Sequence, residues 1–413
     1  MQPEGTTAAV PLAPGSATVA AVPIPWRILI ITLLASTLSN MDQSMFGYAV
    51  PGIMTDLKIG LPSIGLLISA SFAFAIIAAP LISAQVARVG APTVLALSVA
   101  ASALFVGLQA FASGVMSFGV ARVMGFGISA VIIPVSGAYL ATHSPERGRA
   151  MLIAVQQCGY PLGWFVASLL AAPLLQSHGW RATFMVGFVV VPLSFLIYRL
   201  LPRETSSFTA AKSASAQAGL KSLLAGDRAR ITLTFGVAFF LYGGAIGGTS
   251  FYLPTFFQQV RGYDAATATQ VVGLSYAVGM IGYMGAAFVS EMWLSRVATV
   301  VVWLVVASAG LLATIWLPHS VHQDMLAFGA TTIFFYGASS IMLTALLEYF
   351  PSQLRSAAAA VAGTACISLG FVVFPLITAA AVGRIGWSMS FSCLIVPAVL
   401  ISAMLIGSLP RRR

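Results

Sequence analysis

An acid and an arginine lie deep inside apolar stretches of this sequence, where charged residues are rare. At 1.5 Å per helical residue, Asp42 is about 14 Å from Pro51 at the end of its stretch, and Arg122 is about 8 Å from the start of its own. A guanidinium presents a planar fork to a carboxylate and stays charged at any working pH. The protonation of a carboxylate responds to burial and to nearby cations. Together, the two residue types predict binding of an anion and uptake of a proton.

Two interpretations of this pair are open. In the functional one, Arg122 binds the carboxylate of a substrate while Asp42 gains and releases a proton. In the other, the two residues form a static ion pair that holds two helices together. A charge so deep in an apolar medium costs a few kcal/mol or more and usually marks a pathway, which favours the functional interpretation. The other acids are placed in tails, connections or helix ends, with Asp324 among the connections.

Polar and aromatic side chains in other apolar runs are candidates for lining the same site. Gln156 and Gln157 are expected to hydrogen-bond a polar ligand, although contacts between helices explain them about as well. Several tyrosines are expected to line the cavity or else to pack in the core, and those selected are Tyr160, Tyr242, Tyr276 and Tyr336. No metal-ligand spacing, nucleophile elbow or phosphate-binding loop occurs. The sequence therefore predicts no cofactor, no metal site and no enzyme activity.

The composition identifies the medium in which the chain folds. Charged residues make up only 7% of the sequence and hydrophobic residues 59%, whereas a soluble domain has about a quarter charged residues. A chain so poor in charge would aggregate in water. Within lipid, only helices and closed barrels satisfy their backbone groups, and continuous apolar runs are unlike the alternating strands of barrels. The net charge of +10 forms no basic stripe with exposed aromatics, so an all-α membrane protein without a nucleic-acid partner is predicted.

Apolar runs long enough to cross a bilayer occur twelve times. Their approximate limits are 27–50, 61–86, 92–112, 116–140, 150–175, 181–200, 231–257, 268–290, 296–316, 325–348, 357–381 and 386–409. With the N-terminus in the cytoplasm, fifteen of the 20 Lys and Arg residues fall in inner connections and four in outer ones. Because positive residues concentrate on the cytoplasmic side, both termini are predicted to be cytoplasmic. We expect a multi-pass monomer in the cell (inner) membrane.

The two halves of the chain repeat each other. Gly179-Trp180, with Phe184 five residues after the glycine, recurs as Gly386-Trp387 with Phe391, and the segment from Pro145 recurs from Pro351. Offsets of 207 and 206 residues in the same order indicate a 6+6 duplication. The predicted parts are a disordered cytoplasmic tail (1–25), an N-terminal six-helix bundle (26–200), a central cytoplasmic loop (201–230), a C-terminal six-helix bundle (231–409) and a basic cytoplasmic tail (410–413).

Two six-helix halves joined by a cytoplasmic loop resemble the major facilitator superfamily over nearly the whole length. Its organic-anion branches, the aromatic-acid/proton and anion/cation symporters, have an acid in helix 1 and an arginine that opens helix 4. The matching segments are Asn40-Met41-Asp42-Gln43 and Ala121-Arg122-Val123-Met124. Tyr252-Leu253-Pro254-Thr255 is similar to the W-L-P-T motif of the aromatic-acid group. Some anion symporters have a second acid seven residues after the arginine, where this chain has Ser129.

The loop between helices 2 and 3 of the superfamily reads G-x-L-a-D-r-x-G-r-r, and residues 83–90 match it. This stretch keeps Arg88 and has Ala87 at the position of the acid. Its counterpart in the second half, residues 290–296, contains Glu291 and Arg296. In the family this loop latches the inner gate, so the resemblance implies gating roles for Arg88, Glu291 and Arg296. Glu348, at the cytoplasmic end of a helix, is assigned to the same group.

These observations together predict a secondary active transporter for a small organic anion, a mono- or aromatic carboxylate. The predicted mechanism is proton-coupled symport by alternating access, with a central site between the bundles. A proton-driven exporter of drugs or metabolites is the nearer alternative, and it would have an aromatic cavity and a structural Arg122. A receptor or assembly factor would need a large folded loop, and the longest connection has only about thirty residues.

Overall fold

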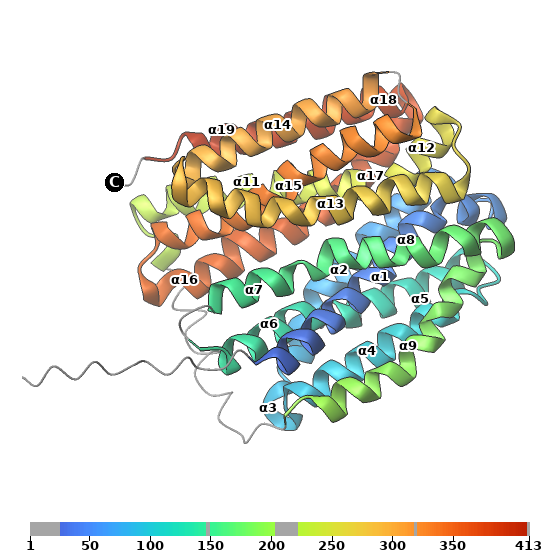
Figure 1. Cartoon of the computed structure of the whole chain (residues 1–413), viewed down its shortest axis with the longest axis horizontal. Helices are drawn as coiled ribbons and strands as arrows, with labels where there is room; N and C mark the ends of the chain where they lie inside the picture. Colours follow the sequence, from blue (N-terminus) through green and yellow to red (C-terminus); the bar gives the residue numbers. More distant parts are fainter. Residues whose placement is uncertain (1–24, 146–148, 203–221, 318–319, 411–413) are drawn as a thin grey trace, which may run out of the picture.

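The computed structural model describes residues 25–145, 149–202, 222–317 and 320–410. Residues 1–24 of the predicted tail, 203–221 of the predicted central loop and 411–413 of the basic tail lie outside the described residues. The described part consists of helices and their connections (Figure 1).

The described part of the first half contains nine helices. They are α1 (Trp26–Asp56), α2 (Leu61–Ser83), α3 (Val86–Val89), α4 (Ala91–Gln109), α5 (Val115–Ser129), α6 (Ile132–His143), α7 (Arg149–Gln157), α8 (Gly159–His178) and α9 (Trp180–Leu200). The segments α5–α6 and α7–α8 are each two pieces of one span.

The second half repeats this plan with two π-helical turns, η1 and η2. Its elements are α11 (Asp227–Ser250), α12 (Leu253–Arg261), α13 (Ala265–Met292), α14 (Arg296–Trp316), α15 (Val321–Tyr349), α16 (Ser352–Ala358), η1 (Ala359–Ala365), α17 (Cys366–Ile385), α18 (Trp387–Ser390), η2 (Phe391–Ile395) and α19 (Val396–Gly407).

Prolines divide three of the runs that the sequence predicted as single helices. The run 116–140 breaks between α5 and α6, the run 150–175 between α7 and α8, and the run 231–257 between α11 and α12. Each break lies two to four residues before a proline, namely Pro134, Pro161 and Pro254. A proline ring clashes with the carbonyl four residues earlier and removes one helical hydrogen bond, which accounts for all three interruptions.

The repeated Gly-Trp motif makes the same contact in both halves. Trp180 Nε1 donates to Asp56 Oδ2 at 3.0 Å, and Trp387 Nε1 donates to Gln259 Oε1 at 2.8 Å. The preceding glycines have φ values of +75° and +76°, a conformation that side chains other than glycine rarely adopt. The motif therefore fastens the start of the last helix in each half to the end of the first helix region.

Helices of the first half pack mainly on one another, and so do those of the second half; Figure 1 shows the two groups side by side, in cool and warm colours. The seam between them is formed by α8 against α13 and α2 against α17. Glycines permit this approach, as membrane helices commonly require. A Cβ on Gly65 of α2 would lie 2.9 Å from the carbonyl oxygen of Pro375, and one on Gly273 of α13 would collide with Ser168.

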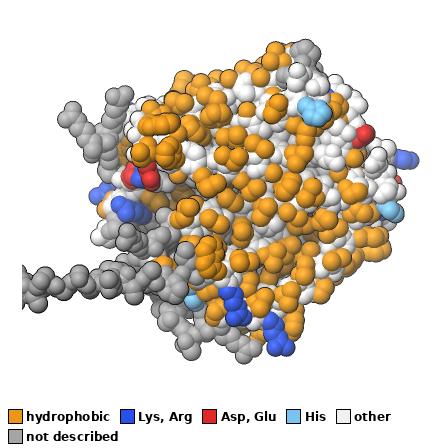
Figure 2. Space-filling view, in the orientation of Figure 1, with side chains coloured by type: hydrophobic (Ala, Val, Ile, Leu, Met, Phe, Trp, Pro, Cys, Tyr) orange, Lys and Arg blue, Asp and Glu red, His pale blue; other side chains and the backbone are white. Residues whose placement is uncertain are grey.

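Within the described residues, eleven helical segments are long and apolar enough to cross a membrane. The helix α1 is not one of them: it has 31 residues, but its middle contains Asn40, Asp42 and Gln43, which lower its hydropathy. Figure 2 shows hydrophobic side chains spread across one whole face, with charged side chains near its ends. Such an apolar surface on a folded chain is suited to lipid rather than to water.

Candidate functional site

Asp42 on α1 and Arg122 on α5 form an ion pair inside the first group of helices. Arg122 Nη1 lies 2.9 Å from Asp42 Oδ1, and their side chains are 1% and 5% exposed. The same nitrogen also contacts the main-chain oxygen of Asp42 at 3.4 Å. Asp42 Oδ2 and Arg122 Nε are buried without a hydrogen bond. The structure thus brings the two predicted residues together, and each retains one polar atom available to another partner.

Two phenylalanine rings cover the guanidinium of Arg122. Its central carbon lies 4.3 Å from the ring centroid of Phe46 and 5.4 Å from that of Phe126. A desolvated cation–π contact contributes about 0.5–2 kcal/mol, so the rings stabilise a charge that has left water. The sequence prediction missed both phenylalanines. Their spacing was an available signal, because each follows one of the two charges by four residues and shares its helix face.

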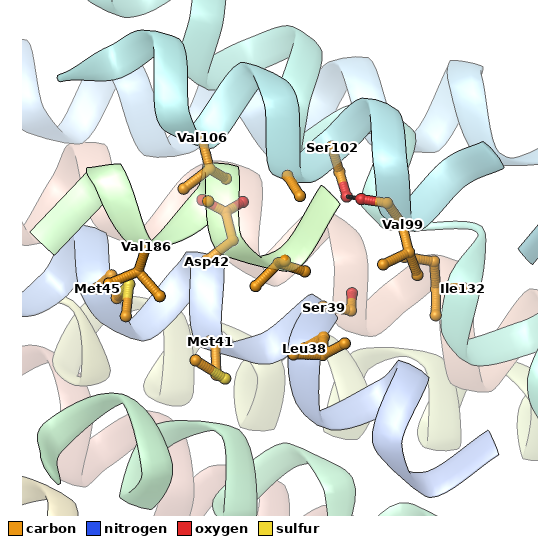
Figure 3. A pocket seen from close by; sticks show the side chains of 13 residues that line it. Leu38, Ser39, Met41, Asp42, Met45, Val99, Ser102, Val106, Ile132 and Val186 are labelled. Atoms are coloured by element: carbon orange, nitrogen blue, oxygen red, sulfur yellow. Dashed lines mark hydrogen bonds between the residues drawn. The ribbon is translucent and has the colours of Figure 1, made fainter. Parts of the chain in front are cut away.

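A cavity of about 30 Å³ lies beside Asp42, between α1, α4, α6 and α9. Its wall is mostly apolar, and Ser39 and Ser102 are its polar members besides the acid; Figure 3 shows the Asp42 carboxylate close to Val106 in this space. A cavity of this size holds about one water molecule and is too small for an organic anion. In this conformation the acid therefore faces a water-sized space within one half of the molecule.

The second half contains a matching cavity of about 30 Å³ with different chemistry. Thr249 and Phe328 line it, and they stand 207 and 206 residues after Asp42 and Arg122. These are the offsets of the repeated motifs, so the pair has a hydroxyl and a phenyl ring as its counterparts. Among the residues lining the two cavities, the ionisable carboxylate occurs only in the first half. The duplicated site therefore has an ion pair in the first half and the uncharged residues Thr249 and Phe328 at the same positions in the second half.

Gln156 and Gln157 are separated by the structure. Gln156 is 2% exposed, and its Nε2 donates to the hydroxyls of Ser36 and Ser136 at 2.7 and 2.9 Å. Gln157 is exposed, as expected for a neighbour about 100° further around the helix. Gln156 therefore fastens α7 to α1 and α6, which agrees with the packing interpretation of that residue.

The selected tyrosines lie mostly at the seam between the halves. Tyr160 on α8 has its ring centroid 6.3 Å from that of Tyr276 and 5.7 Å from that of Tyr336. Trp164, which the sequence prediction missed, stacks on Tyr276 with centroids 4.7 Å apart and planes at 14°. Tyr242 is placed differently, because its hydroxyl donates to the carbonyl of Phe335 at 2.8 Å within the second half. The seam is thus lined by aromatic rings from both halves.

The predicted gating residues do not form one cluster. Arg296 Nη1 lies 2.5 Å from Glu348 Oε1, which joins the start of α14 to the end of α15. Arg88 and Glu291 are exposed, and no ion pair with either of them is found among the described residues. Arg296 and Glu348 are therefore neighbours, whereas Arg88 and Glu291 are not paired with them.

One acid is placed differently from the sequence prediction. Asp324 was expected in a connection, but it lies in the first turn of α15 and is 0% exposed. Its Oδ2 accepts a 2.5 Å hydrogen bond from the Tyr263 hydroxyl and lies 3.6 Å from Arg261 Nε. An acid at a helix N-terminus is favourable, and this partner set allows it to be buried at the end of the helix.

Comparisons with known proteins agree with this fold. Residues 32–366 match the model of the Major Facilitator Superfamily. A gallate transporter of Pseudomonas putida is 28% identical over 46% of this chain and 42% of its own length. A benzoate transport protein of Acinetobacter baylyi is 22% identical over 92% of this chain and 88% of its own. The chain thus spans less than half of the first of these relatives and most of the second.

A solved structure shares the arrangement of helices. A bacterial homolog of the human lysosomal transporter Spinster, in an inward-facing and occupied conformation, superposes with a TM-score of 0.72. That match covers 94% of this chain and 95% of the other at 16% identity, which establishes the fold alone. The family match covers most of the sequence, and the relatives support the predicted resemblance to the organic-anion branches. The chain is a multi-pass membrane transport protein, not an enzyme, and belongs to the major facilitator superfamily.

Proposed function

We propose that the protein is a secondary active transporter that carries a small organic anion, a mono- or aromatic carboxylate, together with protons. It would do so by alternating access, as a monomer in the cell (inner) membrane. In this proposal α1 supplies a twelfth span, both termini are cytoplasmic, and residues 26–200 and 231–409 are the two moving bundles. The relatives described as gallate and benzoate transporters support the substrate class.

The buried pair of Asp42 and Arg122 is the observation that carries this proposal. Breaking a buried ion pair without replacement costs about 3–5 kcal/mol, so Arg122 would leave Asp42 only for another anion. A substrate carboxylate offers the same two oxygens to the guanidinium fork. Once displaced, Asp42 would be an isolated carboxylate in an apolar space, and such a group becomes neutral by binding a proton. Anion binding and proton uptake would therefore favour each other.

Coupling follows if the loaded and empty states rearrange easily and the half-loaded states do not. A charge-balanced site with protonated Asp42 and the anion on Arg122 has no unpaired charge. The empty site has none either, because the ion pair is restored. When Asp42 is protonated and no anion is bound, Arg122 is unpaired. The unpaired charge raises the free energy of the closed state through which the transporter must pass. Symport would result from this difference.

An exporter of drugs or metabolites is the second candidate, and the aromatic seam supports it. Trp164, Tyr276 and Tyr336 offer stacking surfaces that suit many planar molecules. In that case Arg122 would serve structure and the substrate would lack a carboxylate. The exporter predicts that the pH gradient drives substrate in the opposite direction to the proton.

Uptake into proteoliposomes tests the proposal. We expect the purified protein to accumulate a labelled carboxylate from a panel of benzoate, 4-hydroxybenzoate, gallate and hexuronate when the lumen is alkaline. Without a pH gradient, uptake should stop at equilibrium. Arg122→Ala should abolish uptake of every carboxylate. Accumulation of uncharged aromatics by proteoliposomes with an acidic lumen would instead support the exporter.

A further inference from the structure

Two aromatic side chains of the first half face the second half from one helix region. Tyr160 and Trp164 are four residues apart on α8, so they share one helix face, and α8 packs on α13 across the seam. Trp164 is fully buried. Its stack on Tyr276, and the contacts of Tyr160 with Tyr276 and Tyr336, place both side chains where the two halves meet.

The polar atoms of Trp164 and Tyr160 differ in their hydrogen bonding from those of the neighbouring aromatic residues. The Tyr276 hydroxyl donates to Ser250 Oγ at 2.7 Å, and the Tyr48 hydroxyl donates to the carbonyl of Trp164 at 2.9 Å. By contrast, no partner among the described residues lies within hydrogen-bonding distance and angle of Trp164 Nε1 or of the buried Tyr160 hydroxyl, and the Ser250 hydroxyl, which already accepts from Tyr276, interacts with Tyr160 only outside that geometry. A buried polar group left unpaired is costly, so such a group in a native protein needs a specific reason, for example a functional role or a bound water. Two of them, side by side on one helix, indicate a polar subsite.

This subsite is joined to Arg122 by a continuous series of rings. The Phe251 ring centroid is 5.9 Å from that of Trp164 and 6.3 Å from that of Phe46, which itself covers the guanidinium. A flat substrate with its carboxylate on Arg122 would extend along apolar ring surfaces toward Trp164 and Tyr160. The two donors would then meet the end of the substrate that lies opposite its carboxylate.

We propose that Trp164 Nε1 and the Tyr160 hydroxyl recognise a hydroxyl group on the ring of an aromatic carboxylate, and so set substrate specificity. The inference rests on the proposed function and adds a specificity subsite to it. An indole N–H only donates, whereas a tyrosine hydroxyl both donates and accepts. A phenolic hydroxyl satisfies both, because it accepts from Trp164 and exchanges a hydrogen bond with Tyr160. A second carboxylate fits less well, since Arg122 is the one buried Lys or Arg among the described residues.

A comparison of two substrates that differ by one hydroxyl tests this inference. We would measure KM for benzoate and 4-hydroxybenzoate in counterflow by the wild type, Tyr160→Phe and Trp164→Phe. Each variant should raise KM for 4-hydroxybenzoate by roughly fivefold to tenfold, the value of one buried hydrogen bond. For Tyr160→Phe, KM for benzoate should change less than about twofold. Tyr48→Phe is the matched control, because its hydroxyl already bonds within the protein and both acids should respond alike.

The outcomes separate this inference from the proposed function. Equal changes for both acids in Tyr160→Phe would overturn the subsite while leaving carboxylate transport intact. A selective effect on terephthalate instead of 4-hydroxybenzoate would also overturn it, in favour of a second anionic group. Failure of the wild type to transport any carboxylate would refute the proposed function itself. Thermal stabilisation of the purified wild type by each acid gives a readout that does not depend on folding of the variants, and the inference requires greater stabilisation by 4-hydroxybenzoate.

Discussion

Replacing Asp42 by asparagine separates a proton carrier from a static ion pair. Loss of one partner from a buried pair costs about 3–5 kcal/mol. Here part of that cost is offset, because Arg122 keeps the main-chain oxygen of Asp42 and the faces of Phe46 and Phe126. The asparagine carbonyl can also accept the lost hydrogen bond. We therefore expect a loss of about 1–3 kcal/mol, which a domain with a stability of about 5–15 kcal/mol survives.

The two transport assays should then respond differently in Asp42→Asn. Accumulation driven by an alkaline lumen should fall to the background of protein-free liposomes, because the side chain no longer exchanges a proton. Counterflow between preloaded vesicles should persist at least in part, because the neutral side chain resembles the protonated acid. Thermal unfolding in detergent provides the control for folding. Intact pH-driven accumulation would exclude Asp42 as the essential proton carrier. Parallel loss of both assays with a large fall in melting temperature would support the static ion pair.

Three further substitutions test separate parts of the account. Arg122→Lys keeps the charge but loses the planar fork, so uptake should fall roughly tenfold to a hundredfold in a protein that still purifies; near-normal uptake would exclude a carboxylate clamp. Gly282→Ala should destabilise the protein by about 1–3 kcal/mol, because the new Cβ on α13 would collide with the carbonyl oxygen of Ile333 on α15. Gly285→Ala is the control and should not destabilise the protein, because the space around Gly285 is open. Equal melting temperatures of the two variants would contradict the packing of α13 on α15. Burial and the Asp324 carboxylate raise the pKa of Tyr263 to about 12, so the stability contributed by this phenol should be constant below pH 10 and decline as pH rises from 10 through 12. Tyr263→Phe should abolish this decrease in stability at alkaline pH, measured as melting temperature against pH. An unchanged decrease would show that another group causes it.

The sequence was sufficient to predict most of the membrane helices, because apolar length alone defines them. The run 296–316 coincides with α14, and the run 181–200 differs from α9 by one residue. The sequence was less informative where a proline interrupts a run, because the hydropathy of an apolar segment is the same for a continuous helix and for an interrupted one. The prolines at 134, 161 and 254 were visible, but their effect depends on whether neighbouring helices allow a break or, as for Pro51 within α1, a continuous helix.

The site was predictable where charge is scarce and less so where it is made of rings. A chain with one acid and one arginine deep in its spans leaves few ways to pair them, and the structure pairs Asp42 with Arg122. Trp164 could not be distinguished from core aromatics, because its importance comes from an unpaired N–H and from a ring of the other half. Asp324 was misplaced because its burial depends on Arg261 at the end of α12 and on Tyr263 in the connection that follows.

Proton-coupled symport predicts that protons enter the lumen together with the substrate, and the lumenal pH recorded during substrate entry measures this. Wild-type proteoliposomes with a trapped pH-sensitive dye and equal pH on both sides would receive 4-hydroxybenzoate outside. Protein-free liposomes correct for the undissociated acid that crosses lipid unaided, and Asp42→Asn corrects for transport without protons. We expect the lumen to acidify faster in wild-type vesicles than in either control, at a rate that follows uptake of the labelled anion. Labelled uptake in the wild type with a pH change no greater than that of the controls, or with an alkaline shift, would contradict proton-coupled symport.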